Sequence, residues 1–249
     1  MRVTALVVTL LMGLAAPAWS AEVRVAVAAN FAAPMARIAT LFQQESRNTV
    51  AVSLGSSGQL YSQIKAGAPF DIFLAADEIH PQKLQAEGQA VAGSDFVYAL
   101  GKLALWSKRA GYVDDQGKVL FSGGFSKLAI ADPRLAPYGL AAQQTLQQLN
   151  LWTSLQSKLV NGVNIAQAYR FAATENAPLA FVALSQITRD GKVTEGSSWL
   201  VPPNLYQPIR QSAVLLTGAK ENAAARAFLQ FLQREKATAV IRSYGYASP

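Results

Sequence analysis

Residues 25–42 read VAVAANFAAPMARIATLF and join a strand to an amphipathic helix. The first part is a continuous run of small and β-branched apolar residues, which is typical of a strand buried on both faces. After Asn30 the apolar residues recur at helical spacing, which predicts a helix over residues 32–45. The turn between the two elements carries no charged side chain. The question is whether the free backbone N–H groups at this helix start have no ligand or bind an anion.

The same alternation of strand and helix continues through the first hundred residues. Beyond the opening pair, strands are expected over residues 49–54 and 70–75, and helices over residues 58–65 and 77–87. Alternating strands and helices of this kind predict a mainly parallel sheet with helices on both of its faces.

A second run of strands and helices follows. Residues 96–106 have the composition of one long strand that is interrupted by Gly101. The other elements expected in this run are strands over residues 127–131, 178–184 and 211–217, and helices over residues 139–149, 164–174 and 223–243.

The two runs predict the α/β class with two lobes, each a mainly parallel sheet flanked by helices. Residues 21–100 are expected to form the first lobe and residues 101–202 the second, while residues 203–249 return to the first lobe. The chain would then cross twice between the lobes and form a hinge, and the cleft between the lobes is the expected ligand site.

The first twenty residues have the pattern of an export signal. Arg2 provides a positive start, residues 6–14 form a short apolar stretch, and small residues before Ala21 predict cleavage at that point. A membrane anchor is the alternative, but the apolar stretch is too short to span a bilayer. We therefore expect an exported, soluble mature protein.

Composition narrows the possible partners and chemistry. The chain of 249 residues is 51% hydrophobic and 15% charged, and it contains no cysteine, which excludes disulfides, thiolate chemistry and cysteine metal ligands. The formal net charge is +7, but the basic residues are scattered rather than clustered. This distribution argues against a nucleic-acid partner and favours, at most, a weak attraction for small anions.

Residues for enzyme chemistry are sparse. The single histidine, His80, is expected on the surface near a helix start, and GSSG at residues 55–58 is not the G-x-S-x-G motif of a serine hydrolase. The sequence has no phosphate-binding glycine motif and no spacing typical of a metal site. We therefore expect no catalytic residue, no cation ligand and no cofactor. Four acidic residues are expected to serve as caps and in ion pairs: Asp71, Asp77, Asp132 and Glu175.

Four expected helix starts share small or amide residues and lack acids. Each helix N-terminus carries free N–H groups and about half a positive charge, so four of them aimed at one cleft would match a doubly charged oxyanion. Ordinary N-capping by serine and asparagine explains each start equally well, so the residues alone leave both interpretations open. The four starts are Ala29-Asn30, Ser56-Ser57-Gly58, Pro137-Tyr138-Gly139 and Asn164-Ile165.

Five stretches of the chain carry a family resemblance: AVAANFAAPM (residues 26–35), VSLGSSGQLYSQIKAGAPFDIFLAAD (52–77), LAIADPRLAPYGLAAQQTL (128–146), ENAPLAFVAL (175–184) and AFLQFLQREKATAVIRSYGY (227–246). In this order they resemble the periplasmic molybdate-binding proteins (ModA) of ABC importers. The resemblance spans the whole mature chain and is most specific from Gly55 to Asp77.

The resemblance implies a type II periplasmic-binding fold with two lobes that close on molybdate or tungstate. It implies a monomer in the periplasm that delivers the anion to a membrane permease, with no catalytic residue and no cofactor. By position, it also implies which residues contact the ligand. These are Asn30, Ser57, Tyr138 and the backbone amide of Ile165, with Ala29 and Ser56 close enough to contribute.

Two positions depart from the family pattern. Many members have serine where this chain has Asn30, and many have tyrosine where it has Ala183. We expect the Tyr138 hydroxyl to replace the missing phenol as a donor to the anion; the alternative is that this hydroxyl lies in water on the lobe surface. Ser57 has an alternative role as well, the capping of its helix.

Two further functions stay open on the sequence alone. Another tetrahedral oxyanion, sulfate or phosphate, could be the ligand of the same fold. An exported serine hydrolase built on Ser56 or Ser57 is the alternative from a different class. The preference between molybdate and tungstate is not decided by the residues.

Overall fold

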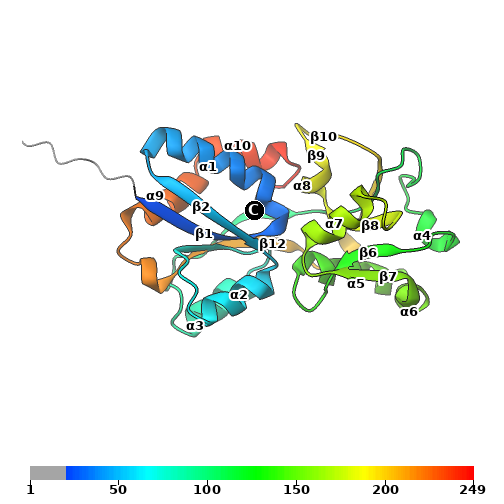
Figure 1. Ribbon diagram of the computed structural model, residues 1–249, viewed down its shortest axis with the longest axis horizontal. Helices are drawn as coiled ribbons and strands as arrows, with labels where there is room; N and C mark the ends of the chain where they lie inside the picture. The colour runs from blue at the N-terminus through cyan, green and yellow to red at the C-terminus, as the bar shows by residue number, and fades with distance from the viewer. Residues whose placement is uncertain (1–20) are drawn as a thin grey trace, which may run out of the picture.

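The computed structural model describes residues 21–249, which fold into two α/β lobes (Figure 1). Each lobe is built on one five-stranded sheet with helices packed against it. The predicted class, α/β with two lobes, is confirmed. The predicted export signal lies outside the described residues. No helix of residues 21–249 is long and apolar enough to cross a membrane.

The first sheet has the strand order β2–β1–β3–β12–β4. Its strands are β1 (Glu22–Ala28), β2 (Thr49–Gly55), β3 (Ile72–Leu74), β4 (Phe96–Gly101) and β12 (Ile209–Leu215). β1 pairs in parallel with β2 and β3, whereas β12 is antiparallel to both β3 and β4. Four of the five strands of this sheet, β1 to β4, therefore point the same way, and the prediction of a mainly parallel sheet is confirmed. β12 runs in the opposite direction, because the chain returns along it from the second lobe.

Helices cover both faces of the first sheet. Figure 1 shows α1 and α10 on one side of it and α2 and α3 on the other. Alternate residues of β1 serve the two cores: Val25 packs with α1, α9 and α10, and Ala26 packs with α2 and α3. The helices are α1 (Ala32–Ser46), entered through the 3-10 turn Ala29–Phe31, α2 (Ser57–Lys65), α3 (Ile79–Ala86), α9 (Ala223–Leu232) and α10 (Glu235–Ser243).

The second sheet has the strand order β11–β5–β8–β6–β7 and is also mixed. β6 is parallel to β7 and β8, while β5 is antiparallel to β8 and β11. β7 and β11 were not predicted, because both strands are short and partly polar. The strands are β5 (Leu103–Ser107), β6 (Leu128–Ala131), β7 (Leu159–Gly162), β8 (Leu179–Ala183) and β11 (Ser197–Leu200).

Two longer helices and several short elements complete the second lobe. α5 (Pro137–Gln148) follows β6, and α7 (Ile165–Ala173) follows β7. The short elements of this lobe are α4 (Val119–Ser122), α6 (Trp152–Leu155), α8 (Leu184–Ile187), the hairpin of β9 (Thr188–Arg189) and β10 (Lys192–Val193), and the 3-10 turns Gln156–Lys158 and Pro203–Leu205. A further 3-10 turn, Thr217–Ala219, follows β12 in the first lobe.

The chain passes between the two sheets at two neighbouring places. β4 ends at Gly101 in the first sheet and β5 begins at Leu103 in the second, so the long strand expected over residues 96–106 is in fact two strands. The return runs from the end of β11 to the start of β12, where Ile209 pairs with Gly101. The two crossing segments therefore lie side by side.

The core of the first lobe gives a stability prediction. Phe228 on α9 is fully buried and packs edge-to-face on Phe42 of α1, with ring centroids 5.1 Å apart. Phe228→Ala should lower the free energy of unfolding by about 3–5 kcal/mol, because it removes a buried ring and leaves a cavity. Phe121→Ala on the exposed side of α4 is the matched control. Urea unfolding of both variants measures the difference, and equal losses would contradict the packing described.

Candidate ligand-binding site

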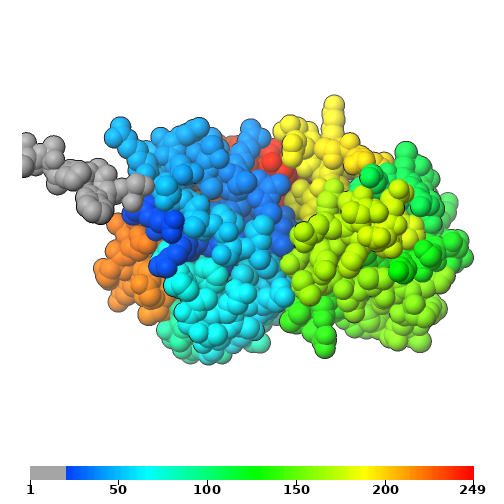
Figure 2. Space-filling view, in the orientation of Figure 1, coloured from blue at the N-terminus to red at the C-terminus, as the bar shows by residue number. Residues whose placement is uncertain are grey.

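A small pocket lies where the two lobes meet. Figure 2 shows the first lobe, blue to cyan, in direct contact with the second, green to yellow. The cavity volume of the pocket is about 10 Å³, which is far less than the ~300–1,000 Å³ of typical small-molecule sites. The pocket therefore suits a compact ligand.

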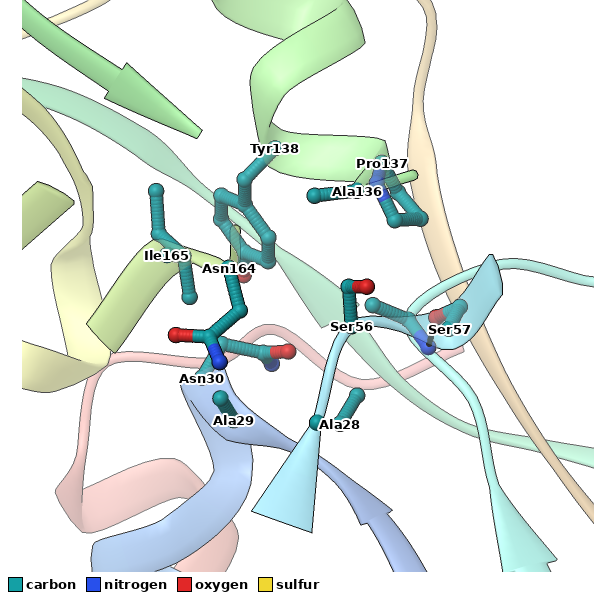
Figure 3. A pocket seen from close by; sticks show the side chains of 12 residues that line it. Ala28, Ala29, Asn30, Ser56, Ser57, Ala136, Pro137, Tyr138, Asn164 and Ile165 are labelled. Atoms are coloured by element: carbon teal, nitrogen blue, oxygen red, sulfur yellow. Dashed lines mark hydrogen bonds between the residues drawn. The ribbon is translucent and has the colours of Figure 1, made fainter. Parts of the chain in front are cut away.

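The pocket is lined by the starts of four helices (Figure 3). α1 and α2 belong to the first lobe, and α5 and α7 to the second. None of the lining side chains is ionisable at neutral pH. The lining residues are Ala28, Ala29, Asn30, Gly55, Ser56, Ser57, Ala76, Ala136, Pro137, Tyr138, Asn164 and Ile165. The six residues predicted as ligand contacts are all among them, and so are Pro137 and Asn164 from the predicted helix starts. The remaining four, Ala28, Gly55, Ala76 and Ala136, are small residues that the sequence did not mark as contacts.

The fold explains why these four helix starts converge. β1, β2, β6 and β7 each lead directly into one of the four helices. Within each sheet these strands are parallel, so their carboxyl ends lie at the same edge. The two edges face each other across the boundary between the lobes, which is where α/β folds place their ligands.

Backbone N–H groups at these helix starts are available to a ligand. The N–H groups of Ser57, Tyr138 and Ile165 lie in the first turns of α2, α5 and α7 and bond to no other described residue. Because such groups have no partner within the helix, they seek one from a side chain, water or a ligand. Three donors thus come from two lobes to one small pocket.

The two serines at the start of α2 have different roles. Ser56 is the N-cap: its Oγ accepts from the Gln59 N–H at 3.4 Å, and the Gln59 side chain accepts from the Ser56 N–H at 3.2 Å. Ser57 instead accepts a hydrogen bond at Oγ from the Ala76 N–H at 2.9 Å. The alternative in which Ser57 caps the helix is therefore wrong, and its hydroxyl proton stays available to a ligand.

Tyr138 is buried at the base of the pocket. Its side chain is 1% exposed, and its hydroxyl oxygen accepts from Gln211 Nε2 at 3.3 Å. The alternative in which this hydroxyl lies in water is therefore wrong. Burial, followed by the neighbouring tyrosines, raises the pKa of Tyr138 well above its ordinary value, so the phenol keeps its proton at neutral pH. Ala183, at the end of β8, does not line the pocket.

The single histidine and the acidic residues lie outside the pocket lining. His80 Nδ1 is 2.8 Å from Asp77 Oδ2 near the start of α3, so no imidazole faces Ser56 or Ser57 as a base. The predicted ion pairs of the other acids are confirmed: Asp71 pairs with Arg24, Asp132 with Arg134 and Glu175 with Arg109. Within residues 21–249, no group of three acidic or histidine side chains is placed to hold a metal cation.

Comparison with known proteins gives a consistent answer. Residues 23–247 match the family model of the bacterial extracellular solute-binding proteins. The molybdate-binding protein ModA of Azotobacter vinelandii is 57% identical over 97% of this chain and 96% of its own length. ModA of Rhodobacter capsulatus is 51% identical over 100% of this chain and 97% of its own length.

A solved structure agrees with this result. The periplasmic molybdate-binding protein of Azotobacter vinelandii superposes with a TM-score of 0.89 at 42% identity, over 92% of this chain and all of that chain. Two α/β lobes that meet at a small neutral pocket define a two-lobed solute-binding protein. More narrowly, the chain belongs to the ModA family of bacterial extracellular solute-binding proteins, and the resemblance seen in the sequence is confirmed.

The buried phenols give a prediction for alkaline pH. Burial raises the pKa of Tyr246 from 10.0 to about 12, and it also holds the pKa values of Tyr98 and Tyr138 well above the ordinary value. Above about pH 10 the unfolded chain loses these protons while the folded chain keeps them. The folded state then binds more protons, so the free energy of unfolding should fall as the pH rises toward 12.

Urea unfolding between pH 8 and 11.5 measures this fall. Tyr246→Phe should make the fall shallower, because one of the groups with a raised pKa is gone. A slope unchanged in Tyr246→Phe would contradict the burial of this phenol.

Proposed function

We propose that the chain binds molybdate, and tungstate as well, in the pocket between the lobes and delivers it to the permease of an ABC importer. The observation that carries this proposal is the convergence of four helix N-termini on one pocket without an ionisable side chain. The relatives described as molybdate-binding proteins support the choice of ligand.

The electrostatics of the pocket fit a doubly charged anion. Each helix start contributes about half a positive charge, so the four together offer roughly two. No carboxylate lines the pocket, so nothing in the lining repels an anion through a full negative charge. A hydrated dianion would therefore exchange its water for fixed backbone dipoles that are already oriented.

The donors fit a tetrahedral ligand with four equivalent oxygens. The backbone N–H groups of Ser57, Tyr138 and Ile165 approach from three helices, and the Ser57 hydroxyl adds a fourth donor. Ala29, Asn30 and Ser56 complete the wall on the side of the first lobe. We propose the Tyr138 hydroxyl as the replacement for the phenol that Ala183 lacks.

The same features argue against the other ligands. Phosphate carries a proton at neutral pH and needs a strong acceptor for it, but the pocket offers no carboxylate. Sulfate is a smaller tetrahedron, so fewer donors from the two lobes would reach it at once. Because no imidazole faces the two serines, we also propose that the chain is not an enzyme and uses no cofactor.

We place the function in the periplasm, with the chain working as a monomer after cleavage before Ala21. The bacterial extracellular family and the relative described as periplasmic support this location. The pattern of the first twenty residues supports the export step.

Isothermal titration with molybdate, tungstate, sulfate and phosphate tests the proposed function. Molybdate and tungstate should give saturable heats, whereas sulfate and phosphate should bind far more weakly. A thousandfold excess of molybdate over its Kd should also stabilise the folded chain by about 4 kcal/mol, which raises the melting temperature. Equal affinity for sulfate, or a melting temperature unmoved by molybdate, would contradict the proposal.

The two serines at the start of α2 provide a paired prediction. Ser57→Ala should weaken molybdate binding by about 10- to 150-fold, because it removes a neutral donor to a charged acceptor. Ser56→Ala should lower the free energy of unfolding by about 1 kcal/mol through loss of the cap, with a smaller effect on affinity. Molybdate titration and urea unfolding of both variants separate the two roles. A loss of affinity in Ser56→Ala together with a loss of stability in Ser57→Ala would contradict these roles.

A further inference from the structure

A buried polar cluster lies behind the pocket and joins the two lobes. We call it the hinge cluster. None of its side chains is more than 5% exposed. Its members are Asn30, Tyr98, Gln211 and Tyr246 from the first lobe, and Tyr138 and Ser185 from the second.

Gln211 on β12 is the centre of this cluster. Its Oε1 accepts from Asn30 Nδ2 at 2.7 Å and from the Tyr98 hydroxyl at 3.1 Å. Its Nε2 donates to the Tyr138 hydroxyl at 3.3 Å. Because an amide side chain has one acceptor end and one donor end, the two bonds at Oε1 fix Nε2 toward Tyr138.

The cluster also determines what Asn30 can offer to a ligand. An asparagine amide has two protons, and both are taken: one by Gln211 Oε1 and the other by the Tyr246 hydroxyl at 2.9 Å. The Asn30 carbonyl oxygen accepts from Tyr246 and from Ser185, each at 2.9 Å. The amide nitrogen and the backbone carbonyl of Asn30 are thus engaged within the cluster, which leaves its backbone N–H as the donor that it can offer to an anion.

The contacts of the cluster depend on closure of the lobes. Tyr138 belongs to α5 and Ser185 to α8, whereas Gln211 and Asn30 belong to the first lobe. Gly101, at the end of β4, leaves the room that this approach requires, because a Cβ there would overlap the Tyr138 hydroxyl and lie 2.9 Å from Gln211 Nε2. If the lobes separate, Gln211 loses its second-lobe partner.

We propose that Gln211 is a positioning residue for the anion site. Its Oε1 accepts one proton of the Asn30 amide, so that this proton is not offered to the anion. Its Nε2 donates to the Tyr138 oxygen, so that the Tyr138 proton is left for the anion. Since the bond to Tyr138 spans the two lobes, Gln211 also links anion binding to closure. This inference rests on the proposed function, because it names how two residues of the same site are held.

Gln211→Glu tests the direction of these bonds. An ionised carboxylate has no donor for the Tyr138 oxygen, accepts the Tyr138 proton instead, and adds a charge that repels the anion. The titratable groups that face position 211 are Tyr98 on β4, Tyr138 on α5 and Tyr246 after α10, and Asp77 acts on Tyr98. Burial should raise the pKa of the new carboxyl group, so acid restores a neutral side chain with a proton to donate.

Molybdate titrations of this variant at pH 8 and pH 5 measure the effect. At pH 8, Gln211→Glu should bind molybdate about 100-fold more weakly than the wild type. At pH 5 its affinity for molybdate should be at least about 10-fold higher than at pH 8. The wild type and Gln230→Glu, which places the same charge on the exposed side of α9, should bind equally at both pH values. A loss that does not depend on pH, or no loss, would overturn the inference.

A double-mutant cycle gives a second, independent test with neutral variants. Gln211→Met and Tyr138→Phe should each weaken molybdate binding by about 10-fold. Because Gln211 acts through Tyr138, the loss of affinity in the double variant should be smaller than the product of the two single losses. Strictly multiplicative losses would overturn the inference. Circular dichroism and melting temperature establish that each variant is folded before titration.

The wild type separates the two proposals. If the wild type does not bind molybdate, the proposed function fails. If it binds molybdate and the Gln211 variants bind equally well, only the role of Gln211 fails.

Discussion

Four helices begin at one small pocket, and the positive end of each helix dipole points into the same volume. The two sheets hold these helix ends in place. β1 and β2 fix two of them in the first lobe, and β6 and β7 fix the other two in the second. Because the donors are backbone groups on rigid strand-to-helix turns, the pocket can attract a dianion without an ionised side chain and without proton transfer.

Each lobe supplies only half of this arrangement, so the four helix starts come together only where the two lobes meet. The boundary between the lobes is tied by direct bonds: the Gly58 N–H donates to the Leu135 carbonyl at 2.9 Å, and Ser185 Oγ donates to the Asn30 carbonyl at 2.9 Å. These neutral bonds are individually modest. The buried cluster around Gln211 adds further bonds between the lobes, and these connect the pocket to β12, the strand along which the chain returns to the first lobe.

Local sequence patterns were enough to predict the two lobes and to mark the four helix starts, because each helix start follows its own strand directly. They left open whether these starts share a ligand, and it was the family resemblance that implied the contact residues. The mixed sheets were not predictable in this way, since the direction of β12 depends on a partner far along the chain. The short strands β7 and β11 carry too few apolar residues for a periodic signal. Gln211 was missed because its partners, Asn30, Tyr98 and Tyr138, come from three distant segments.

Anomalous X-ray diffraction from crystals grown with molybdate would test the central claim most directly, because molybdenum scatters anomalously and the protein atoms hardly do. The account predicts one strong peak between the starts of α1, α2, α5 and α7, with the oxygens of the anion within hydrogen-bond distance of the backbone N–H groups of Ser57, Tyr138 and Ile165. A peak elsewhere on the chain, or an anion held in this pocket by an ionised side chain, would contradict it.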